Sequence, residues 1–401
     1  MYFTLNPNIL LDKLSKLYYT EFMLIDRSIL IKIQKQLTGE PKIIIIYGPR
    51  QSGKTTLIGQ LLKGFELPCL IFTGEDLRTQ ELFGIADLDR LKKIVGANKL
   101  LVIDEAQRIQ NIGLILKLLF DSLKIHIIAS GSSSFDLANK INEPLTGRSV
   151  TFTLYPLGVP EVPKNILETI PAKIEEFLRF GLYPKVVTLL SEAEKELYLN
   201  ELINNYLYKD ILSFETIRKP KKIVDLLSLL ALQIGSEVSI QELAQNLSLS
   251  KIIVDKYLDL LEKMFVIINI RGFSRNLRKE ISKTSKYYFI DLGFRNALIR
   301  NFNQLNLRSD GGVMFENLCV VEKLKSLVNK GEFANLYFWR TYDQKEIDLI
   351  EEKNGHLTAF EFKFTPKKTK LTSAGKEFIS VYKNSTYKIV SPNNFEQFLN
   401  N

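Results

Sequence analysis

Short apolar runs, separated by longer mixed segments, dominate the first 160 residues of the chain. Four of them have strand length and consist mainly of β-branched and aliphatic residues: Ile43–Tyr47, Leu100–Ile103, Ile125–Ala129 and Val150–Leu154. Runs of this kind are typical of strands buried on both faces of a parallel sheet. The pattern therefore predicts an α/β fold for this part of the chain, with a helix over residues 54–63 soon after the first strand.

A glycine-containing segment joins the first predicted strand to this helix. It fits the P-loop pattern G-x-x-x-x-G-K-[ST], in which the glycines let backbone N–H groups point at phosphate oxygens. The lysine brings a cation to the β- and γ-phosphates, the next hydroxyl binds magnesium, and the helix N-terminus adds its positive end. A chance match in a loop is the alternative, but the flanking strand and helix favour nucleotide binding. We expect Mg-ATP to contact Gly48, Pro49, Arg50, Gln51, Ser52, Gly53, Lys54, Thr55 and Thr56.

An acidic pair, Asp104 and Glu105, ends the second predicted strand. In the Walker B arrangement the aspartate holds magnesium and the glutamate orients the attacking water. This pair is typical of hydrolysing ATPases, whereas Ras-type switches use a glutamine for the second task. An acidic pair at a helix N-terminus is the alternative interpretation, and the P-loop upstream favours the Walker B one.

Two further polar residues lie at the ends of later predicted strands. Ser132 follows the third strand, at the position where the sensor 1 residue of AAA+ proteins contacts the γ-phosphate, but a serine-rich turn explains it equally well. Arg148 precedes the fourth strand and is a candidate arginine finger, acting in cis or from a neighbouring subunit. A surface arginine bound to a carboxylate explains Arg148 equally well.

The middle of the chain has helical periodicity. Apolar residues recur at three- and four-residue spacing within 161–218, which predicts helices there. Ser239 and Glu242 form a capping box that opens a helix over 240–247, and a short turn leads to a second helix. Two strands around a basic loop follow. Together these elements predict a winged-helix region over 219–300.

Basic residues crowd the loop of this predicted wing. Residues 271–286 hold six bases and one acid, namely Arg271, Arg275, Arg278, Lys279, Lys283 and Lys286 against Glu280. A basic loop beside a recognition helix suits contact with the phosphates of DNA. The alternatives are a merely solvated surface and a winged helix that contacts protein, so both DNA and a protein stay candidate partners.

Three charged residues on neighbouring predicted strands mark the last hundred residues. Glu361 and Lys363 alternate with phenylalanines and so share one strand face, while Asp348 lies on the preceding strand across the turn at 353–355. Asp…Glu-x-Lys on paired strands is the PD-(D/E)xK nuclease constellation, in which two carboxylates hold a divalent metal and the lysine assists water. Glu316 on the preceding helix adds a carboxylate. The alternatives are an exposed ion pair and an inactive domain that only binds.

The chain resembles the prokaryotic AAA-family ATPases that carry a C-terminal DUF4143-type region, relatives of the archaeal AAA ATPases. The motifs that carry the resemblance are Gly48–Thr55, Asp104–Gln107, Gly131–Ser133, Thr146–Arg148 and Leu154–Leu157. It implies an ASCE-type sheet in which a sensor strand separates the Walker A and Walker B strands. The residue patterns and this resemblance together predict an N-terminal helical extension (1–30), a P-loop AAA ATPase domain (31–160), a helical lid (161–218), a winged-helix-like region (219–300) and a DUF4143-type, nuclease-like α/β domain (305–401).

Composition narrows the function classes further. Two cysteines and two histidines are too few for a disulfide framework or a zinc finger, and they make a histidine-based triad a poor expectation. The site chemistry that remains for this chain is that of phosphates, carboxylates and hydroxyl groups. The net charge of +9 favours an anionic partner. No apolar run is long enough to span a membrane and the N-terminus has no signal-peptide pattern, so we expect a cytoplasmic protein.

The sequence thus predicts an ATPase that couples Mg-ATP turnover to DNA or protein contacts through its C-terminal domains, with a protein partner or a homo-oligomer as candidate assemblies. One alternative is a nucleotide-gated interaction switch with a vestigial nuclease-like domain. Another is an ATP-regulated, metal-dependent DNA nuclease.

Overall fold

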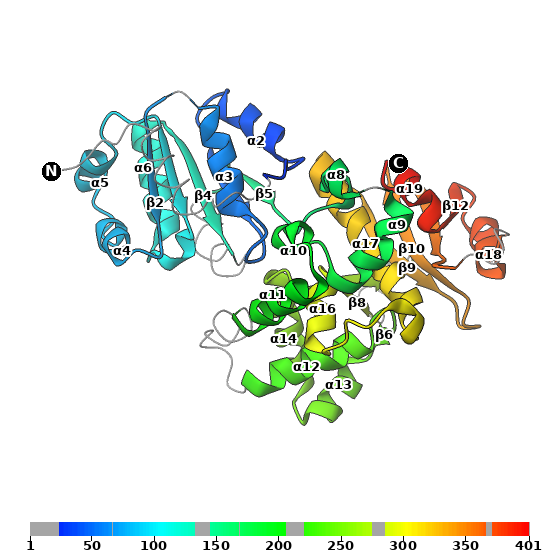
Figure 1. Ribbon diagram of the computed structural model, residues 1–401. Coiled ribbons are helices and arrows are strands. Elements are labelled where there is room, and N and C mark those ends of the chain that lie inside the picture. The colour runs from blue at the N-terminus through cyan, green and yellow to red at the C-terminus, as the bar shows by residue number, and fades with distance from the viewer. Residues whose placement is uncertain are drawn as a thin grey trace. The chain divides into compact units, whose positions relative to one another are not determined.

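The computed structural model divides the chain into two units, residues 1–156 and 157–401 (Figure 1). The predicted N-terminal extension lies largely outside the described residues. Among the helices that the structure describes, none is both long enough and apolar enough to cross a membrane. The described residues are 24–65, 67–132, 145–167, 169–205, 220–274, 285–365 and 371–400.

The first unit is built on a parallel five-stranded sheet with the strand order β2-β3-β4-β1-β5. The predicted strands and the helix over 54–63 are confirmed, and β4 separates β1 from β3 as the resemblance implies. The strands are β1 (Ile43–Tyr47), β2 (Cys69–Thr73), β3 (Leu100–Asp104), β4 (His126–Gly131) and β5 (Ser149–Thr153). The helices are α2 (Leu30–Leu37), α3 (Lys54–Lys63), α4 (Leu77–Phe83), α5 (Leu88–Val95), the 3-10 turn η1 (Ala106–Arg108) and α6 (Ile112–Leu123).

Burial of β1 sets the layers of this unit. The strand is apolar along its whole length, and every one of its residues is buried. Because side chains alternate across a sheet, Ile44 and Ile46 face one side, where they share a core with Ile33 of α2 and Leu57 of α3. In a parallel sheet the carboxyl ends of the strands lie along one edge, so the segments after β1, β3 and β4 come together there.

The second unit starts with helices, including a helix–turn–helix. The helices predicted within 161–218 are confirmed over the described residues up to 205. The predicted N-cap is also present, because the Ser239 hydroxyl accepts a hydrogen bond from the N–H of Glu242 at 3.3 Å. The helices are α8 (Lys164–Leu167), α9 (Ile170–Phe180), α10 (Pro184–Thr188), α11 (Glu192–Asn205), α12 (Pro220–Leu232), α13 (Ile240–Leu247), α14 (Lys251–Lys263) and α16 (Leu292–Leu298), and the 3-10 turns are η2 (Val159–Glu161) and η4 (Leu305–Leu307).

A seven-stranded mixed sheet with the order β12-β11-β10-β9-β7-β8-β6 completes this unit. β7 pairs antiparallel with β8 and parallel with β9, so the hairpin after α14 and the C-terminal strands share one sheet. The last part of the chain runs α17-β9-β10-β11-α18-β12, with β12 parallel to β11. The strands are β6 (Glu237–Val238), β7 (Ile267–Gly272), β8 (Ser285–Phe289), β9 (Asn335–Arg340), β10 (Glu346–Lys353), β11 (His356–Phe362) and β12 (Ser385–Val390), and the remaining helices are α17 (Gly311–Lys330), α18 (Ser373–Val381), the 3-10 turn η5 (Pro392–Asn394) and α19 (Phe395–Asn400).

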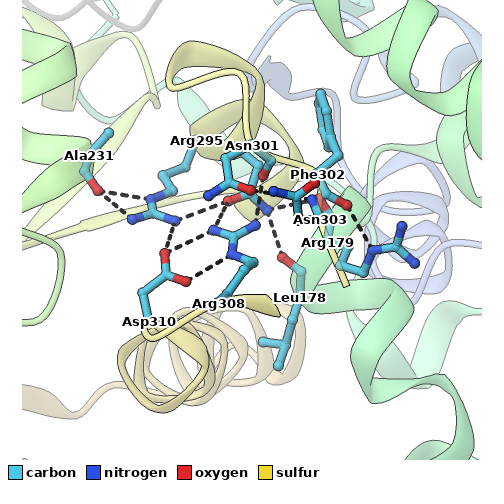
Figure 2. A network of polar contacts seen from close by, with 10 residues as sticks. Leu178, Arg179, Ala231, Arg295, Asn301, Phe302, Asn303, Arg308 and Asp310 are labelled. Carbon is cyan, nitrogen blue, oxygen red and sulfur yellow. Dashed lines mark hydrogen bonds and ion pairs between the residues drawn. The ribbon is translucent and has the colours of Figure 1, made fainter. Parts of the chain in front are cut away.

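A buried polar network ties the segment before α17 to α12 (Figure 2). Both nitrogens on one side of the Arg295 guanidinium, Nε and Nη2, donate to the carbonyl of Ala231, at 2.9 and 2.6 Å. Its third nitrogen, Nη1, donates to Asp310 Oδ2 at 2.6 Å. Arg308 donates to both oxygens of the same carboxylate, at 2.8 Å each. Two buried guanidinium groups thus share one carboxylate at the start of α17, which fixes where this helix begins.

Asp310 should make the second unit sensitive to acid. Partial burial tends to raise the pKa of its carboxyl, but the hydrogen bonds from Arg308 and Arg295 prevail and lower that pKa to about 2. A depressed carboxyl pKa adds stability above its unfolded value, and this contribution is lost as the pH falls from about 4 to about 2. The carboxylate is partly exposed, so we expect screening to reduce the contribution to about 1 kcal/mol.

The measurement is the free energy of urea unfolding of the second unit as a function of pH, for the wild type and for Asp310→Asn. The wild type should lose more stability than the variant between about pH 4 and about pH 2. Asp343→Asn, which changes an exposed aspartate, serves as the matched control and should follow the wild type. Parallel curves for wild type and Asp310→Asn would contradict the prediction.

Candidate functional site

Two glycines shape the loop between β1 and α3. Gly48 lies so close to the end of β5 that a Cβ atom on it would be 2.1 Å from the carbonyl oxygen of Leu154. Gly53 has φ 93° and ψ 24°, a left-handed conformation that glycine adopts without strain. Helix α3 then begins at Lys54. The loop therefore ends on a helix N-terminus, whose free N–H groups and dipole favour an anion.

The side chain of Lys54 folds into this loop. Its Nζ donates to the carbonyl oxygens of Gly48 and Pro49, at 2.9 Å each, and only 5% of the residue is exposed. The hydroxyl of Ser52 is also buried and has no hydrogen-bond partner among the described residues. A buried cation, a buried hydroxyl and a helix N-terminus thus converge on one loop. This donor set fits a phosphate group.

Asp104 connects the P-loop to the Walker B strand. The hydroxyl of Thr55 donates to its Oδ2 at 2.7 Å, and Ser130 at the end of β4 donates to its Oδ1. Two adjacent ligands of one octahedral magnesium lie about 2.9 Å apart, so the Thr55 and Asp104 oxygens are spaced as such ligands would be. The structure therefore brings together the two predicted magnesium ligands, which are 49 positions apart in the chain.

Glu105 is held in a backbone conformation that few residues other than glycine adopt. With φ 48° and ψ 43° it lies in the left-handed region, which costs about 1 kcal/mol or more. Its Oε2 accepts a hydrogen bond of 2.5 Å from Nε2 of Gln107. The same nitrogen lies 3.2 Å from the Ser132 hydroxyl. Gln107 thus joins the predicted water-activating glutamate to the predicted sensor serine.

Arg27 braces the P-loop from outside the motif. Its guanidinium donates to the carbonyl oxygens of Ser52 and Tyr155, at 2.7 Å each, and the residue is 7% exposed. No local pattern in the sequence points to Arg27, because both acceptors are backbone atoms far along the chain. Ser130 and Gln107 were missed for a different reason. Ser130 contacts Asp104 because β4 pairs with β3, and Gln107 reaches Glu105 within the 3-10 turn that follows β3, so neither contact is visible in the residue types alone.

Replacing Arg27 with alanine is expected to loosen the P-loop. The variant leaves two buried carbonyl groups without their donor, so we expect a loss of about 1–3 kcal/mol in unfolding free energy and weaker ATP binding. Thermal denaturation and titration with a fluorescent ATP analogue measure the two effects. Lys35→Ala, an exposed position on the neighbouring helix α2, is the matched control. If both variants bind the analogue equally well, Arg27 does not position the loop.

Arg148 lies at the other end of the sheet from the P-loop. Its carbonyl oxygen accepts from the N–H of Ile43 at the start of β1, whereas the P-loop follows Tyr47 at the end of that strand. A five-residue strand separates these ends by about 16 Å. The side chain forms a bidentate ion pair with Asp121, at 2.8 and 3.1 Å. A role as a cis arginine finger is therefore wrong, and the surface ion pair is what this chain shows.

Four acidic side chains gather at one place in the second unit, and we call them the carboxylate cluster: Glu316, Glu346, Asp348 and Glu361. The predicted hairpin brings Asp348 beside Glu361, because β10 and β11 pair across a turn at Asn354 and Gly355, both with positive φ. Asp348 Oδ2 accepts from the N–H of Phe362 at 2.7 Å. Glu361 Oε1 is paired with Lys363 at 2.7 Å, so the three predicted residues do come together.

The cluster is electrostatically crowded. Burial, and then the negative charges of Glu316 and Glu361, raise the pKa of Asp348 well above its ordinary value. Burial also raises the pKa of Glu316, against the opposing effect of Lys286. Among the residues the structure describes, no three histidine, cysteine, aspartate or glutamate side chains are grouped as metal ligands. The cluster therefore does not present a ready metal site.

Lys286 is not a surface residue of the predicted basic wing. Only 1% of it is exposed, and its Nζ lies 3.2 Å from Glu316 Oε1 and 2.5 Å from Glu346 Oε1. Burial tends to lower the pKa of Lys286, but the charges of Glu316 and Glu346 raise it above the usual value. Lys286 is thus unavailable to phosphates, which corrects the prediction for this position. Arg271 is exposed, and the other four bases of the wing lie outside the described residues.

Comparison with known proteins assigns three stretches of the chain to sequence families. Residues 40–162 match an AAA domain, residues 171–305 match a domain of unknown function (DUF8612), and residues 311–399 match another (DUF4143). The first match contains the P-loop, Asp104 and Glu105. The third contains α17 and the strands that carry Asp348 and Glu361.

Proteins similar to most of this chain come from both bacteria and archaea. An uncharacterised protein of Methanocaldococcus jannaschii is 30% identical over 312 residues, which is 70% of this chain and 70% of that protein. An uncharacterised protein of Mycobacterium tuberculosis is 28% identical over 348 residues, covering 86% of this chain and 75% of that protein. Among solved structures, a Walker-type ATPase of Pyrococcus abyssi matches 70% of this chain and 97% of its own, with a TM-score of 0.50 and 17% identity. At that identity the likeness concerns the fold.

Proposed function

Because this chain belongs to the prokaryotic family that joins an AAA-type P-loop domain to a DUF4143 domain, we propose that it binds Mg-ATP and hydrolyses it. The observation that carries the proposal is the 2.7 Å contact between the Thr55 hydroxyl and Asp104. It brings a Walker A hydroxyl and a Walker B carboxylate to one point beside a loop that suits phosphate. Thr55 and Asp104 would hold magnesium there, and the ion would supply positive charge to the phosphates during hydrolysis.

Each residue of the site has one task in this proposal. Lys54 exchanges its contacts with the loop carbonyls for the β- and γ-phosphate oxygens, and the backbone N–H groups of residues 50–56 surround the phosphates. Glu105 orients and deprotonates the attacking water, while Gln107 keeps its carboxylate in place and links it to Ser132. Because Arg148 is far from the P-loop of its own chain, it could act only on ATP bound by a neighbouring subunit. It would first have to break its ion pair with Asp121.

We further propose that ATP turnover is coupled to DNA through the middle of the chain. A helix–turn–helix, α13 and α14, is followed by the hairpin β7–β8, the element order of a winged helix. The exposed Arg271 and the bases at 275–283 would contact the phosphate backbone. These bases account for most of the charge surplus in the wing, so the contact would be chiefly electrostatic.

Turnover with and without DNA tests the coupling. ATP hydrolysis is measured at about 50 and about 200 mM salt, with single-stranded DNA, double-stranded DNA or none. We expect stimulation by DNA at low salt and much less at high salt, because binding releases counterions. A variant with Arg271, Arg275 and Arg278 changed to alanine should lose the stimulation and keep basal turnover. A rate of ATP hydrolysis that is the same with and without DNA at both salt concentrations would rule the coupling out.

The second candidate function is a nucleotide-gated interaction switch with an inactive C-terminal domain. The observation that favours it is the buried ammonium of Lys286, which pairs with Glu316 and Glu346 beside Asp348 and Glu361 and so places a positive charge where a catalytic metal would have to bind. This candidate predicts slow turnover that does not respond to DNA, together with partner binding that differs between ATP and ADP. Pull-down of protein partners in the two nucleotide states distinguishes it from the first proposal.

A further inference from the structure

The lysine inside the carboxylate cluster comes from outside the DUF4143 domain. Lys286 lies on β8, whereas Glu316 is on α17 and Glu346 on β10. Its Nζ contacts both glutamates, at 3.2 and 2.5 Å, and lies 5.4 Å from the centre of the Phe338 ring. One ammonium group is thus enclosed by three other elements of the sheet unit. A lone ammonium would not be buried so fully, so the carboxylates are what hold it there.

Lys286 and its neighbours occupy oxygen atoms that a metal would need. Glu316 Oε1 accepts from Lys286 at 3.2 Å and from the hydroxyl of Tyr288 at 2.6 Å, and Tyr288 lies on the same strand as Lys286. Asp348 Oδ2 is engaged by a backbone N–H, and Glu361 Oε1 by Lys363. A divalent ion that used these oxygens would have to displace their donors, and at any oxygen of the cluster it would approach the ammonium groups of Lys286 and Lys363 against electrostatic repulsion.

One acceptor in the cluster is not engaged. Glu361 Oε2 is buried and has no hydrogen-bond partner among the described residues. Four acidic side chains therefore face two lysines, with at least one oxygen open to a further positive charge. The arrangement has the acidic residues of a metal site but holds its own cation.

We propose that Lys286 is the resident cation of the carboxylate cluster, taking the place of the divalent metal that Asp348 and Glu361 would otherwise hold. The C-terminal domain then binds no divalent metal while Lys286 is in place, and its fold serves binding rather than metal-dependent cleavage. The inference goes beyond the proposed ATPase function and is independent of it, because no residue of the P-loop takes part.

Manganese binding to the full-length, nucleotide-free protein tests the proposal. All proteins carry Asp104→Asn, so that the P-loop adds no metal signal, and isothermal titration with Mn²⁺ is the readout. The parent should show no Mn²⁺ site in the second unit. Lys286→Met should gain one, at least about tenfold tighter than any binding by the parent, and Lys286→Met with Asp348→Asn should lose it again.

A control and a second measurement protect the test against misfolding. Lys345→Met removes a partly exposed lysine that is paired with Glu377 outside the cluster, and it should gain no Mn²⁺ site. If Lys286→Met does not fold, the test uses the parent protein alone, and its melting temperature is measured with and without Mn²⁺. A rise in that temperature that Asp348→Asn abolishes would overturn the proposal, as would a folded Lys286→Met protein that gains no site. An unchanged melting temperature in the parent supports it.

Discussion

Replacing Glu105 with glutamine is expected to lower steady-state ATP turnover by about 10²- to 10³-fold while ATP still binds. Glutamine keeps the shape of the side chain and removes its capacity to accept a proton from water. The binding groups, Lys54, Thr55 and Asp104, are on other parts of the site and stay unchanged. Steady-state phosphate release and titration with a fluorescent ATP analogue separate the two quantities.

The structure gives this prediction a control and a specific neighbour to examine. Glu81→Gln makes the same change at an exposed position on α4 and should leave turnover as it was. Gln107→Ala removes the donor that holds Glu105 Oε2 at 2.5 Å, so it should lower turnover less than Glu105→Gln does. If Glu105→Gln hydrolyses ATP at the parent rate, another group activates the water and the assigned role is wrong.

Replacing Gly48 with alanine is expected to destroy the nucleotide site by sterics alone. The new methyl carbon would lie 2.1 Å from the Leu154 carbonyl oxygen. The backbone of Leu154 is itself held in place, because its N–H donates to the carbonyl oxygen of Tyr47 at 2.7 Å. Neither strand end can move without breaking the β1–β5 pairing. We expect a loss of about 3 kcal/mol in unfolding free energy and ATP binding weakened about tenfold or more.

Gly39→Ala is the matched control for this substitution. Gly39 lies between α2 and β1, and a Cβ atom there would meet nothing within 4 Å. Chemical denaturation should give the Gly39→Ala protein an unfolding free energy close to that of the parent. A Gly48→Ala protein that is as stable as this control, and that binds ATP as tightly, would contradict the prediction, because it would show that a methyl group fits at this position.

Local sequence patterns were sufficient for several parts of the molecule. The strand before the P-loop, the left-handed glycine and the following helix are adjacent in the chain, so their geometry follows from a few consecutive residues. The β10–β11 hairpin was predictable for the same reason. Its Asn354–Gly355 turn favours positive φ, and alternation along β11 then places Glu361 and Lys363 on one face.

The predictions that failed concern partners far apart in the chain. Arg148 has the residue type of an arginine finger, but parallel pairing of β5 with β1 puts it at the end of the sheet away from the P-loop. Lys286 has the residue type of a phosphate contact, but pairing of β7 with β9 brings its hairpin into the C-terminal sheet, where Glu316 and Glu346 bind it. Charge by itself could not distinguish these environments.

The sequence by itself determined the nucleotide-binding loop, the acidic pair after β3 and the three charged residues of the C-terminal hairpin. The tertiary structure decided which groups complete each site: Arg27 and Ser130 beside the nucleotide loop, and Lys286 inside the carboxylate cluster. The physical reason is the range of the interactions. Backbone conformation and strand periodicity depend on neighbouring residues, whereas a buried charge takes its partner from whichever segment the packing of the sheet brings within hydrogen-bonding distance.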